Sequence, residues 1–305
     1  MYFPIRYKHF SIAFIAWEST AYPETFVEAV KKNYDQLWVP STWQKGYSGS
    51  VFGKNFVKVV PEGVDPDIYT WVERYPIDKK PKGTVDFLIV GKWEPRKSTE
   101  ELIRAFIKGA RDYYRLHLVV DNPFPVDHLK TTQERLDFYK LNDPRIIIHS
   151  DLNDQDLVDL YHRCDIFLSC SRAEGWNLPL IEAMACGCYC VYSDTGAQKA
   201  FARGYAVPIQ KQIAPFDVFG LENCPGYWEE PSYQHLQDWI EQLNIIELYS
   251  LMEKTKKTSK WVRSAFSWDA AAEKATQILQ EINPIKEIKA KYDNLTVSYH
   301  FINVS

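Results

Sequence analysis

Several features that would assign a chain to a membrane or to a nucleic acid are missing here. The 305 residues carry 36 Lys and Arg against 40 Asp and Glu, for a formal net charge of −4. Because no global basic field is present, this composition does not favour binding of nucleic acid. The longest apolar runs are far too short to cross a bilayer, and no secretory signal follows Met1. We therefore expect a cytoplasmic protein.

Metal-site and dinucleotide patterns are also missing. Of the six Cys residues, Cys186, Cys188 and Cys190 lie too close together in sequence for an ordinary disulfide. No CxxC or CxxH partner stands at zinc spacing, so we interpret these thiols as small buried side chains in a reducing compartment. No G-x-G-x-x-G string follows an early strand, which disfavours a nicotinamide-dependent oxidoreductase.

Short apolar runs alternate with helical patterns through most of the chain. This alternation predicts an α/β fold built on parallel sheets. The expected strands span residues 11–17, 35–39, 56–60, 85–90, 116–120, 145–149, 165–168 and 189–192. The expected helices span residues 24–33, 133–141, 153–163, 177–186, 248–257 and 268–282, two more begin at residues 42 and 98, and residues 226–243 are expected to be a loop and then a helix.

The stretch from Ser169 to Asp194 combines a strand, a polar loop, a helix and a second strand. Glu174 lies in the loop, and Glu182 lies on the helix, where it can still point towards the mouth of the loop. The helix begins near Asn177 and Leu178, and its free N–H groups and dipole favour an anion. Two carboxylates with amides between them suit a sugar nucleotide, although two solvated glutamates on an ordinary strand–helix unit remain the alternative.

A second polar loop follows the strand at residues 85–90. It contains Gly91 and three cations, among them Lys92 and Lys97, and leads directly into a helix. Cations pair with phosphate oxygens and a helix N-terminus supplies amides, so the loop suits a diphosphate. The carboxyl ends of parallel strands share one edge of a sheet, which would place both lysines near Glu174. Solvated cations on a surface loop are the alternative.

Several strings resemble a known family. EGWNLPLIEAMACG closely resembles the E-G-F-G-L-P-x-x-E-A-M-A-x-G signature of the family-four retaining glycosyltransferases, with Trp176 for Phe and Asn177 for the second Gly. Residues 91–97 resemble the G-R-x-x-x-x-K element, with Lys92 and Lys97 at the Arg and Lys positions. AWESTAYPETF resembles a subgroup that carries W-E-x-x-x-x-P at the end of a strand. Many other relatives have a His at this position, which faces the donor sugar and the acceptor, and Glu18 would stand in its place. A surface glutamate at a strand end is the alternative for Glu18.

The resemblance implies a GT-B-like α/β fold with two Rossmann-like domains, the N-terminal one truncated. The implied division is as follows: 1–70, a partial acceptor-side domain; 71–83, a linker; 84–225, a nucleotide-sugar-binding domain; 226–283, closing helices; 284–305, a tail. In the tail, residues 296–303 alternate like a strand. Residues 266–268, FSW, resemble the start of the family helix that crosses back onto the N-terminal domain.

The implied activity is transfer of a sugar from a nucleotide-diphosphate sugar to a glycan or other hydroxyl acceptor, with retention of configuration and no metal requirement. Lys92 and Lys97 would neutralise the diphosphate, Glu182 would bind the ribose and Glu174 the donor sugar. Glu18 would orient the sugar or the acceptor. The alternative is a non-catalytic sugar-nucleotide or glycan-binding module, or one part of a split or larger enzyme with a partner supplying the missing N-terminal half. Peripheral membrane contact stays open.

Overall fold

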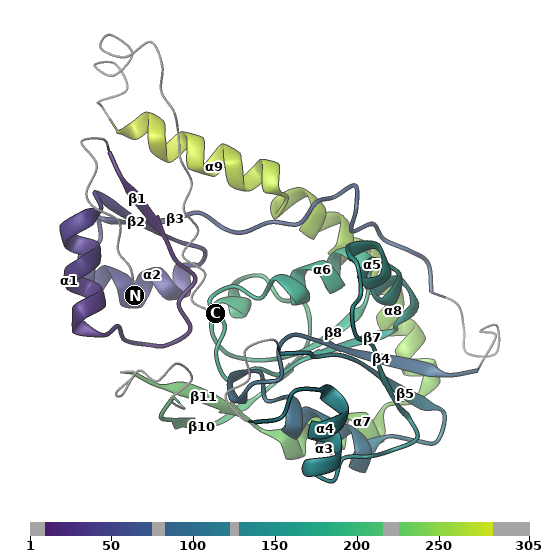
Figure 1. Ribbon diagram of the computed structural model, residues 1–305. Coiled ribbons are helices and arrows are strands. Elements are labelled where there is room, and N and C mark those ends of the chain that lie inside the picture. The colour runs from purple at the N-terminus through teal and green to yellow at the C-terminus, as the bar shows by residue number, and fades with distance from the viewer. Residues whose placement is uncertain (1–9, 75–82, 123–127, 216–225, 283–305) are drawn as a thin grey trace.

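The computed structural model describes residues 10–74, 83–122, 128–215 and 226–282. Two parallel sheets, each covered by helices, organise these residues into what we call the first unit (residues 10–60) and the second unit (residues 83–265). Figure 1 shows the two units side by side, with the first in purple and the second in blue to green. The predicted α/β class is confirmed.

The first unit is a short βαβαβ arrangement. Its elements are β1 (Ile12–Phe14), α1 (Glu24–Asn33), β2 (Gln36–Val39), α2 (Thr42–Phe52) and β3 (Val57–Val59), with the strands in the order β1-β2-β3. The side chain of Ser41 accepts a hydrogen bond from the Gln44 amide and caps α2, as its sequence position indicates. The first strand is shorter than the predicted span of residues 11–17, because ladder pairing with β2 covers only three residues.

The second unit contains a six-stranded parallel sheet in the order β6-β5-β4-β7-β8-β9. Its strands are β4 (Val85–Val90), β5 (Tyr114–Val119), β6 (Ile146–Ile148), β7 (Ile166–Ser169), β8 (Tyr189–Ser193) and β9 (Gly204–Val207). Its helices are η2 (Pro95–Lys97), α3 (Thr99–Gly109), α4 (Thr132–Phe138), α5 (Asp154–Arg163), α6 (Leu178–Cys186), η3 (Ala197–Ala200), α7 (Tyr233–Gln242) and α8 (Ile245–Ala265).

Both faces of this sheet are buried, as parallel sheets require. On one face Phe87 packs with Phe106 of α3 and Leu236 of α7. On the other face Phe167 packs with residues of α5, α6 and α8, including Met184 and Val262. Cys164, Cys186, Cys188 and Cys190 pack on this second face and Cys170 packs on the first, and all five are free thiols.

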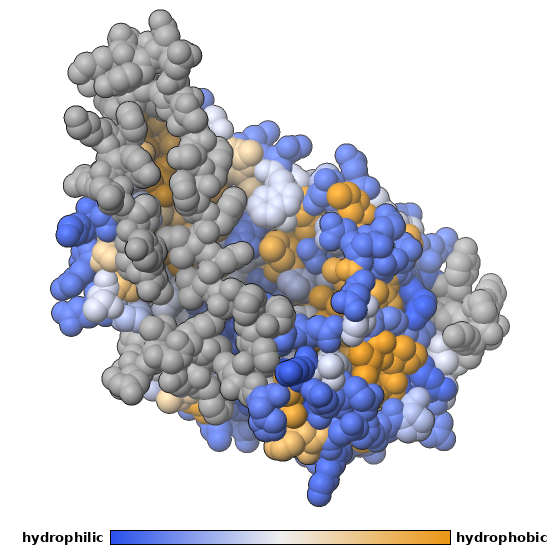
Figure 2. Space-filling model, in the orientation of Figure 1, coloured by the Kyte–Doolittle hydropathy of each residue, from blue (hydrophilic) through white to orange (hydrophobic). Residues whose placement is uncertain are grey.

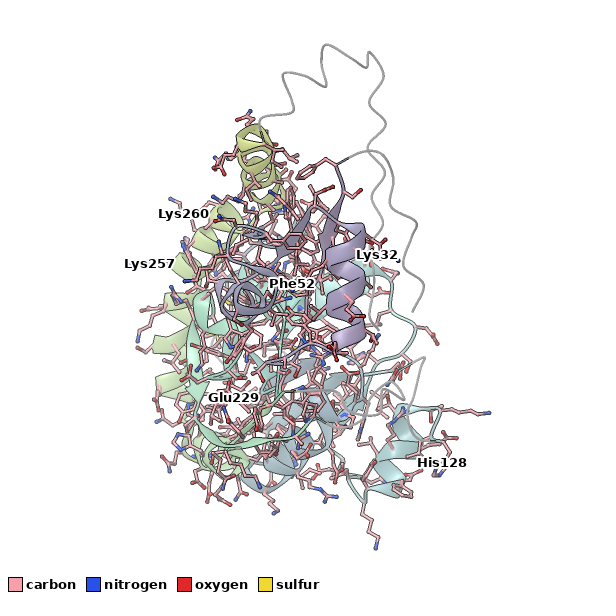
Figure 3. The ribbon with its side chains drawn as sticks, turned by 90° about the vertical axis from the view of Figure 1, so that its left-hand side faces the viewer. Lys32, Phe52, His128, Glu229, Lys257 and Lys260 are labelled. Carbon is pink, nitrogen blue, oxygen red and sulfur yellow. The ribbon has the colours of Figure 1, made fainter. Side chains whose placement is uncertain are left out.

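Two predictions about the second unit were wrong. Residues 228–231 were expected to be a loop, but they form β11 (Trp228–Pro231), which pairs antiparallel with β10 (Ile209–Ile213). The strand β10, like β9 of the parallel sheet, is short and largely exposed. Neither strand therefore contains an apolar run that would predict it from the sequence. The helix expected at 248–257 is also longer and spans Ile245–Ala265. In Figure 3, Lys257 and Lys260 lie along its outer side.

Two crossing segments join the units. The Val64 amide donates to the Phe266 carbonyl and the Trp268 amide donates to the Val64 carbonyl, so residues 63–65 run beside residues 266–268. A Cβ added at Gly63 would lie 2.5 Å from the Ser267 carbonyl carbon, and only glycine fits this crossing. Beyond it, α9 (Trp268–Glu281) returns over the first sheet, where Ile278 packs with Trp38 and Val60 (Figure 1).

Two observations describe the hydropathy of the surface (Figure 2) and of the helices. Over the second unit, the face in Figure 2 shows hydrophilic and hydrophobic residues intermixed rather than gathered in a band. Among the described residues, none of the helices has the length and apolar character that a bilayer crossing needs. The strand expected at residues 296–303 lies outside the described residues.

Candidate functional site

Charged side chains from both units meet where the parallel strands end. Lys97 lies in η2, after β4, and Glu174 lies in the loop after β7. The Lys97 Nζ stands 2.6 Å from Glu174 Oε1. The sequence predicted this meeting, because the carboxyl ends of neighbouring parallel strands share an edge.

Arg96 is the hub of the cluster, a role that the sequence reading did not give it. Its Nε lies 2.8 Å from a carboxylate oxygen of Glu18, which belongs to the first unit. Its Nη1 donates to Glu174 at 3.1 Å and its Nη2 to Glu94 at 2.6 Å. The five N–H groups of a planar guanidinium allow Arg96 to serve three carboxylates in three directions. The sequence signal was present, since Arg96 is one of the three cations of the loop, between Lys92 and Lys97.

Burial and neighbouring charge set the ionisation of Glu174. Its side chain is 3% exposed, and burial alone would oppose ionisation. The charges of Lys97 and Arg96 outweigh that effect and lower the Glu174 pKa below its usual value. Glu174 is therefore an anion held between two cations.

Two further carboxyl groups have raised pKa values. Burial raises the pKa of Glu18 to about 7, with Arg96 opposing the shift and Glu174 adding to it. Burial, together with the charges of Glu174 and Glu18, raises the pKa of Glu62 to about 7. Glu62 follows β3 and was not predicted as a site residue. Near neutral pH the cluster can therefore take up or release protons.

Lys92 and Leu178 lie in the segments that follow β4 and β7. Lys92 lies in the loop between β4 and η2, two residues after the last strand residue, and its side chain is partly buried. Gly91 before it has a φ of 149°, and a Cβ added there would touch the aliphatic part of Lys97. Leu178 is the first residue of α6, so its amide is among the free N–H groups of that helix.

Glu182 lies apart from the ion pairs. Its Oε2 accepts a hydrogen bond of 2.9 Å from the Tyr161 hydroxyl of α5, and Tyr69 is a second hydrogen-bond partner. Burial raises the pKa of Glu182, and these two hydroxyls partly offset the shift. The side chain was expected to point towards the loop mouth, whereas its carboxylate contacts tyrosines from α5 and from the connection between the units. Its role with a ribose stays a prediction.

Asn177 adopts a backbone geometry that favours glycine. Its φ of 90° and ψ of 69° place it in the left-handed region, directly before α6. Its side-chain amide donates to Ser169 Oγ at 2.9 Å and to Gln198 Oε1 at 2.8 Å. Gln198 in turn donates to the Ser193 carbonyl at 2.7 Å. The Asn177 side chain therefore ties the turn to the ends of β7 and β8.

The β10–β11 hairpin reaches the same place, which no sequence pattern indicated. The Trp228 indole N–H donates to the Glu18 carbonyl at 2.8 Å, and the Tyr227 amide donates to Thr20 Oγ1 at 2.8 Å. Glu229, labelled in Figure 3, hydrogen-bonds through its carboxylate to Thr195 after β8. The hairpin therefore bridges the two units beside Glu18.

Arg172 connects the loop after β7 to the hairpin and to α3. It is buried and forms ion pairs with Glu230 at 2.9 Å and with Glu101 of α3. Its amide also donates to the Arg96 carbonyl at 2.8 Å. Arg172 thereby joins the hairpin, α3 and the segment that carries Arg96 and Lys97. In the described residues, no group of three or more His, Cys, Asp or Glu side chains has an arrangement that could hold a metal ion.

Residues 84–214 match the family model described as "Glycosyl transferases group 1". A curated relative, the serotype-specific mannosyltransferase WbdA of Escherichia coli, is 35% identical over 95 residues. That match covers 31% of this chain and 12% of WbdA, so the chain spans only a small part of this relative's length.

Two solved structures share the fold at low sequence identity. A sucrose-phosphate synthase of Thermosynechococcus elongatus superposes with a TM-score of 0.64 at 19% identity, over 86% of this chain and 63% of that one. Anabaena Alr3699/HepE, solved in complex with UDP and glucose, superposes with a TM-score of 0.64 at 15% identity, over 89% of this chain and 71% of that one. The chain therefore has the GT-B-like fold that the sequence predicted, with Rossmann-like parallel sheets.

Proposed function

We propose that this chain transfers a sugar from a nucleotide-diphosphate sugar to a hydroxyl acceptor, with retention of anomeric configuration. The observation that carries the proposal is the contact between Lys97 and Glu174 at the carboxyl ends of β4 and β7. It lies inside the segment that matches the glycosyl transferases group 1 model. Retention follows from the resemblance of the Glu174–Gly187 string to the family signature.

Each predicted residue has a chemical task in this proposal. Lys97 and Lys92 neutralise the charge that develops on the departing diphosphate. The amides at the start of α6, near Asn177 and Leu178, bind phosphate oxygens. Electrostatic stabilisation of this kind needs no metal ion, and a solved GT-B-like relative is described with UDP and glucose.

The carboxylates would bind hydroxyl groups. Glu174 is ionised and accepts hydrogen bonds from the donor sugar once Lys97 turns towards the phosphates. Glu182 accepts from the ribose hydroxyls in exchange for its tyrosine partners. Glu18 orients the sugar or the acceptor from the first unit. The acceptor in this proposal is a glycan or another hydroxyl compound.

A thermal-shift screen of the purified chain against UDP-glucose, GDP-mannose and ADP-glucose tests donor binding. A ligand that binds only the folded state raises the melting temperature, by an amount that grows with ligand concentration. We expect one donor to raise it and Glu182→Ala to abolish the shift. No shift with any donor at millimolar concentration would contradict the proposal.

Lys97→Ala tests the phosphate role separately. We expect turnover, measured as release of the nucleotide diphosphate, to fall by roughly 100- to 1000-fold, because a stabilising charge is lost from the transition state. The melting temperature should change little by comparison. Lys108→Ala, a basic residue in the last turn of α3, is the matched control. Equal losses of stability and activity in Lys97→Ala would contradict a phosphate role.

A second function is favoured by the charge balance of the cluster. Glu18, Glu62, Glu94 and Glu174 outnumber the two cations Arg96 and Lys97, and this excess opposes a diphosphate. A non-catalytic module that binds glycan hydroxyls, or one part of a larger transferase, needs no diphosphate site. Sugar binding without nucleotide binding, measured by calorimetry, would favour this reading.

A further inference from the structure

Arg96 uses most of its hydrogen-bonding capacity within the protein. Besides Glu18, Glu174 and Glu94, its Nη1 donates to the Ala173 carbonyl at 3.0 Å. A guanidinium has five N–H groups in a fixed plane. Little of that capacity remains for a phosphate, and the Arg96 side chain is only 11% exposed. Lys97 is nearly as buried, at 15% exposed, but it has a flexible stem with three donors, of which Glu174 needs one.

The partners of Arg96 come from opposite sides of the site. Glu18 belongs to the first unit, four residues after β1, and Glu174 to the second unit, after β7. The Trp228 indole fixes the backbone of Glu18, while Arg96 fixes its carboxylate. Gly175, next to Glu174, lies so close to the first unit that an added Cβ would stand 2.9 Å from the Ala16 carbonyl carbon. The two carboxylates thus face each other across one guanidinium.

We propose that Arg96 is a positioning residue, which holds Glu18 of the first unit opposite Glu174 of the second unit for the transfer step. This inference rests on the proposed function, and it assigns the donor phosphates to Lys97 rather than to Arg96. Without the guanidinium, the carboxylates of Glu18, Glu94 and Glu174 repel one another. Glu18, 32% exposed, is the one able to swing away.

The positioning role of Arg96 predicts a change in the pKa of Glu18 that can be measured. Glu18 faces Arg96 and Lys97 of η2, Glu94 before it, Glu174 of the loop after β7, and Glu62 after β3. Arg96 lowers the pKa of Glu18, while burial and Glu174 raise it. Removing the guanidinium therefore moves the pKa of Glu18 upwards. Any step that needs Glu18 ionised then requires a higher pH.

The test compares Arg96→Met and Arg96→Lys with Lys97→Met and with the control Arg104→Met. Arg104 also pairs with a carboxylate, Glu100, but on the exposed face of α3. The probe is whichever of UDP-glucose, GDP-mannose and ADP-glucose the unmodified chain binds. Donor affinity is measured by calorimetry, turnover by nucleotide release, and folding by the melting temperature.

For Arg96→Met we expect donor affinity within about 3-fold of the unmodified chain and turnover lower by roughly 100-fold, as a misplaced reacting group produces. The acid limb of the pH–rate profile should move to higher pH. Arg96→Lys keeps the charge but not the fork, so it should recover only part of the loss. In a Glu18→Gln background, Arg96→Met should cost far less, because both changes remove the same contact.

The inference is overturned if Arg96→Met weakens donor affinity as much as Lys97→Met, since Arg96 would then be a phosphate ligand. It is also overturned if the effects of Glu18→Gln and Arg96→Met on turnover are additive. If the Met variant does not fold, the lysine variant and the pH profile decide the same question. Failure of every donor to bind the unmodified chain would instead overturn the proposed function, and the positioning role with it.

Discussion

At the scale of single residues, the site holds more carboxyl groups than cations. Arg96 and Lys97 compensate Glu174, which stays ionised, whereas burial and the charges of Glu174 and Glu18 raise the pKa of Glu62. Its surroundings are a buried position and two other glutamates. Ionisation of Glu62 in the folded chain is therefore unfavourable, and the protonated form persists to higher pH.

This raised pKa makes a prediction about stability. Because the pKa of Glu62 rises from 4.5 to about 7 on folding, its contribution to stability is complete below pH 4.5 and is lost as pH rises to about 7. Glu62→Gln removes that loss. We expect the variant to gain roughly 1 to 3 kcal/mol over the unmodified chain between pH 5 and pH 8.

Urea denaturation at the two pH values measures this difference. Glu253→Gln, at an exposed position of α8, is the control and should show no such trend. A constant difference between Glu62→Gln and the unmodified chain across the range would show that Glu62 ionises as freely when folded as when unfolded.

At the scale of elements, the turn between β7 and α6 depends on Asn177. This residue pairs a positive φ with a side chain that hydrogen-bonds to Ser169 and Gln198. Asparagine tolerates the left-handed region better than other residues with a Cβ, and glycine tolerates it best. The same loop contains Glu174, whose carbonyl accepts a hydrogen bond from the Ala197 amide.

Two substitutions of Asn177 separate the effect of its backbone conformation on stability from the effect of its side-chain hydrogen bonds. Asn177→Ala keeps a Cβ at positive φ and loses both hydrogen bonds, so we expect a loss of roughly 2 to 4 kcal/mol in the free energy of unfolding. Asn177→Gly relieves the backbone and should lose less. Chemical denaturation of both variants provides the measurement, and a larger loss for glycine than for alanine would contradict this account.

At the scale of the whole molecule, the β10–β11 hairpin and α9 both link the units. The hairpin binds residues 18–20 beside the site, and α9 packs on the first sheet at the far end. Glu18 therefore depends on a contact that the first unit cannot make alone. Sheet, hairpin and connecting segments together decide where its carboxylate lies.

Trp228→Phe should weaken this link without disturbing either core. The phenyl ring keeps most of the buried apolar area but lacks the N–H that donates to the Glu18 carbonyl. We expect a loss of about 1 kcal/mol in the free energy of unfolding. Trp43→Phe, in α2 of the first unit, is the control. An unchanged denaturation midpoint for Trp228→Phe would show that the hairpin contact does not contribute to stability.

The sequence alone determined the parallel-sheet architecture and the meeting of Lys97 with Glu174. Both follow from local patterns: apolar runs of strand length, helices between them, and polar loops at strand ends that must share one edge. The positive φ of Asn177 and the cap at Ser41 are equally local, since each depends on a few neighbouring residues. The division into domains and the truncation of the first one stay predictions.

Tertiary structure alone decided the rest. Arg96 reaches Glu18 across 78 residues of sequence and Trp228 reaches Glu18 across 210, and no periodicity encodes such contacts. The hairpin strands are short and half exposed, so their pairing depends on what surrounds them. The tyrosine partners of Glu182 likewise come from α5 and from the connection between the units. The residue types of this site can be recognised from the local sequence, but packing between the units determines which side chains are in contact.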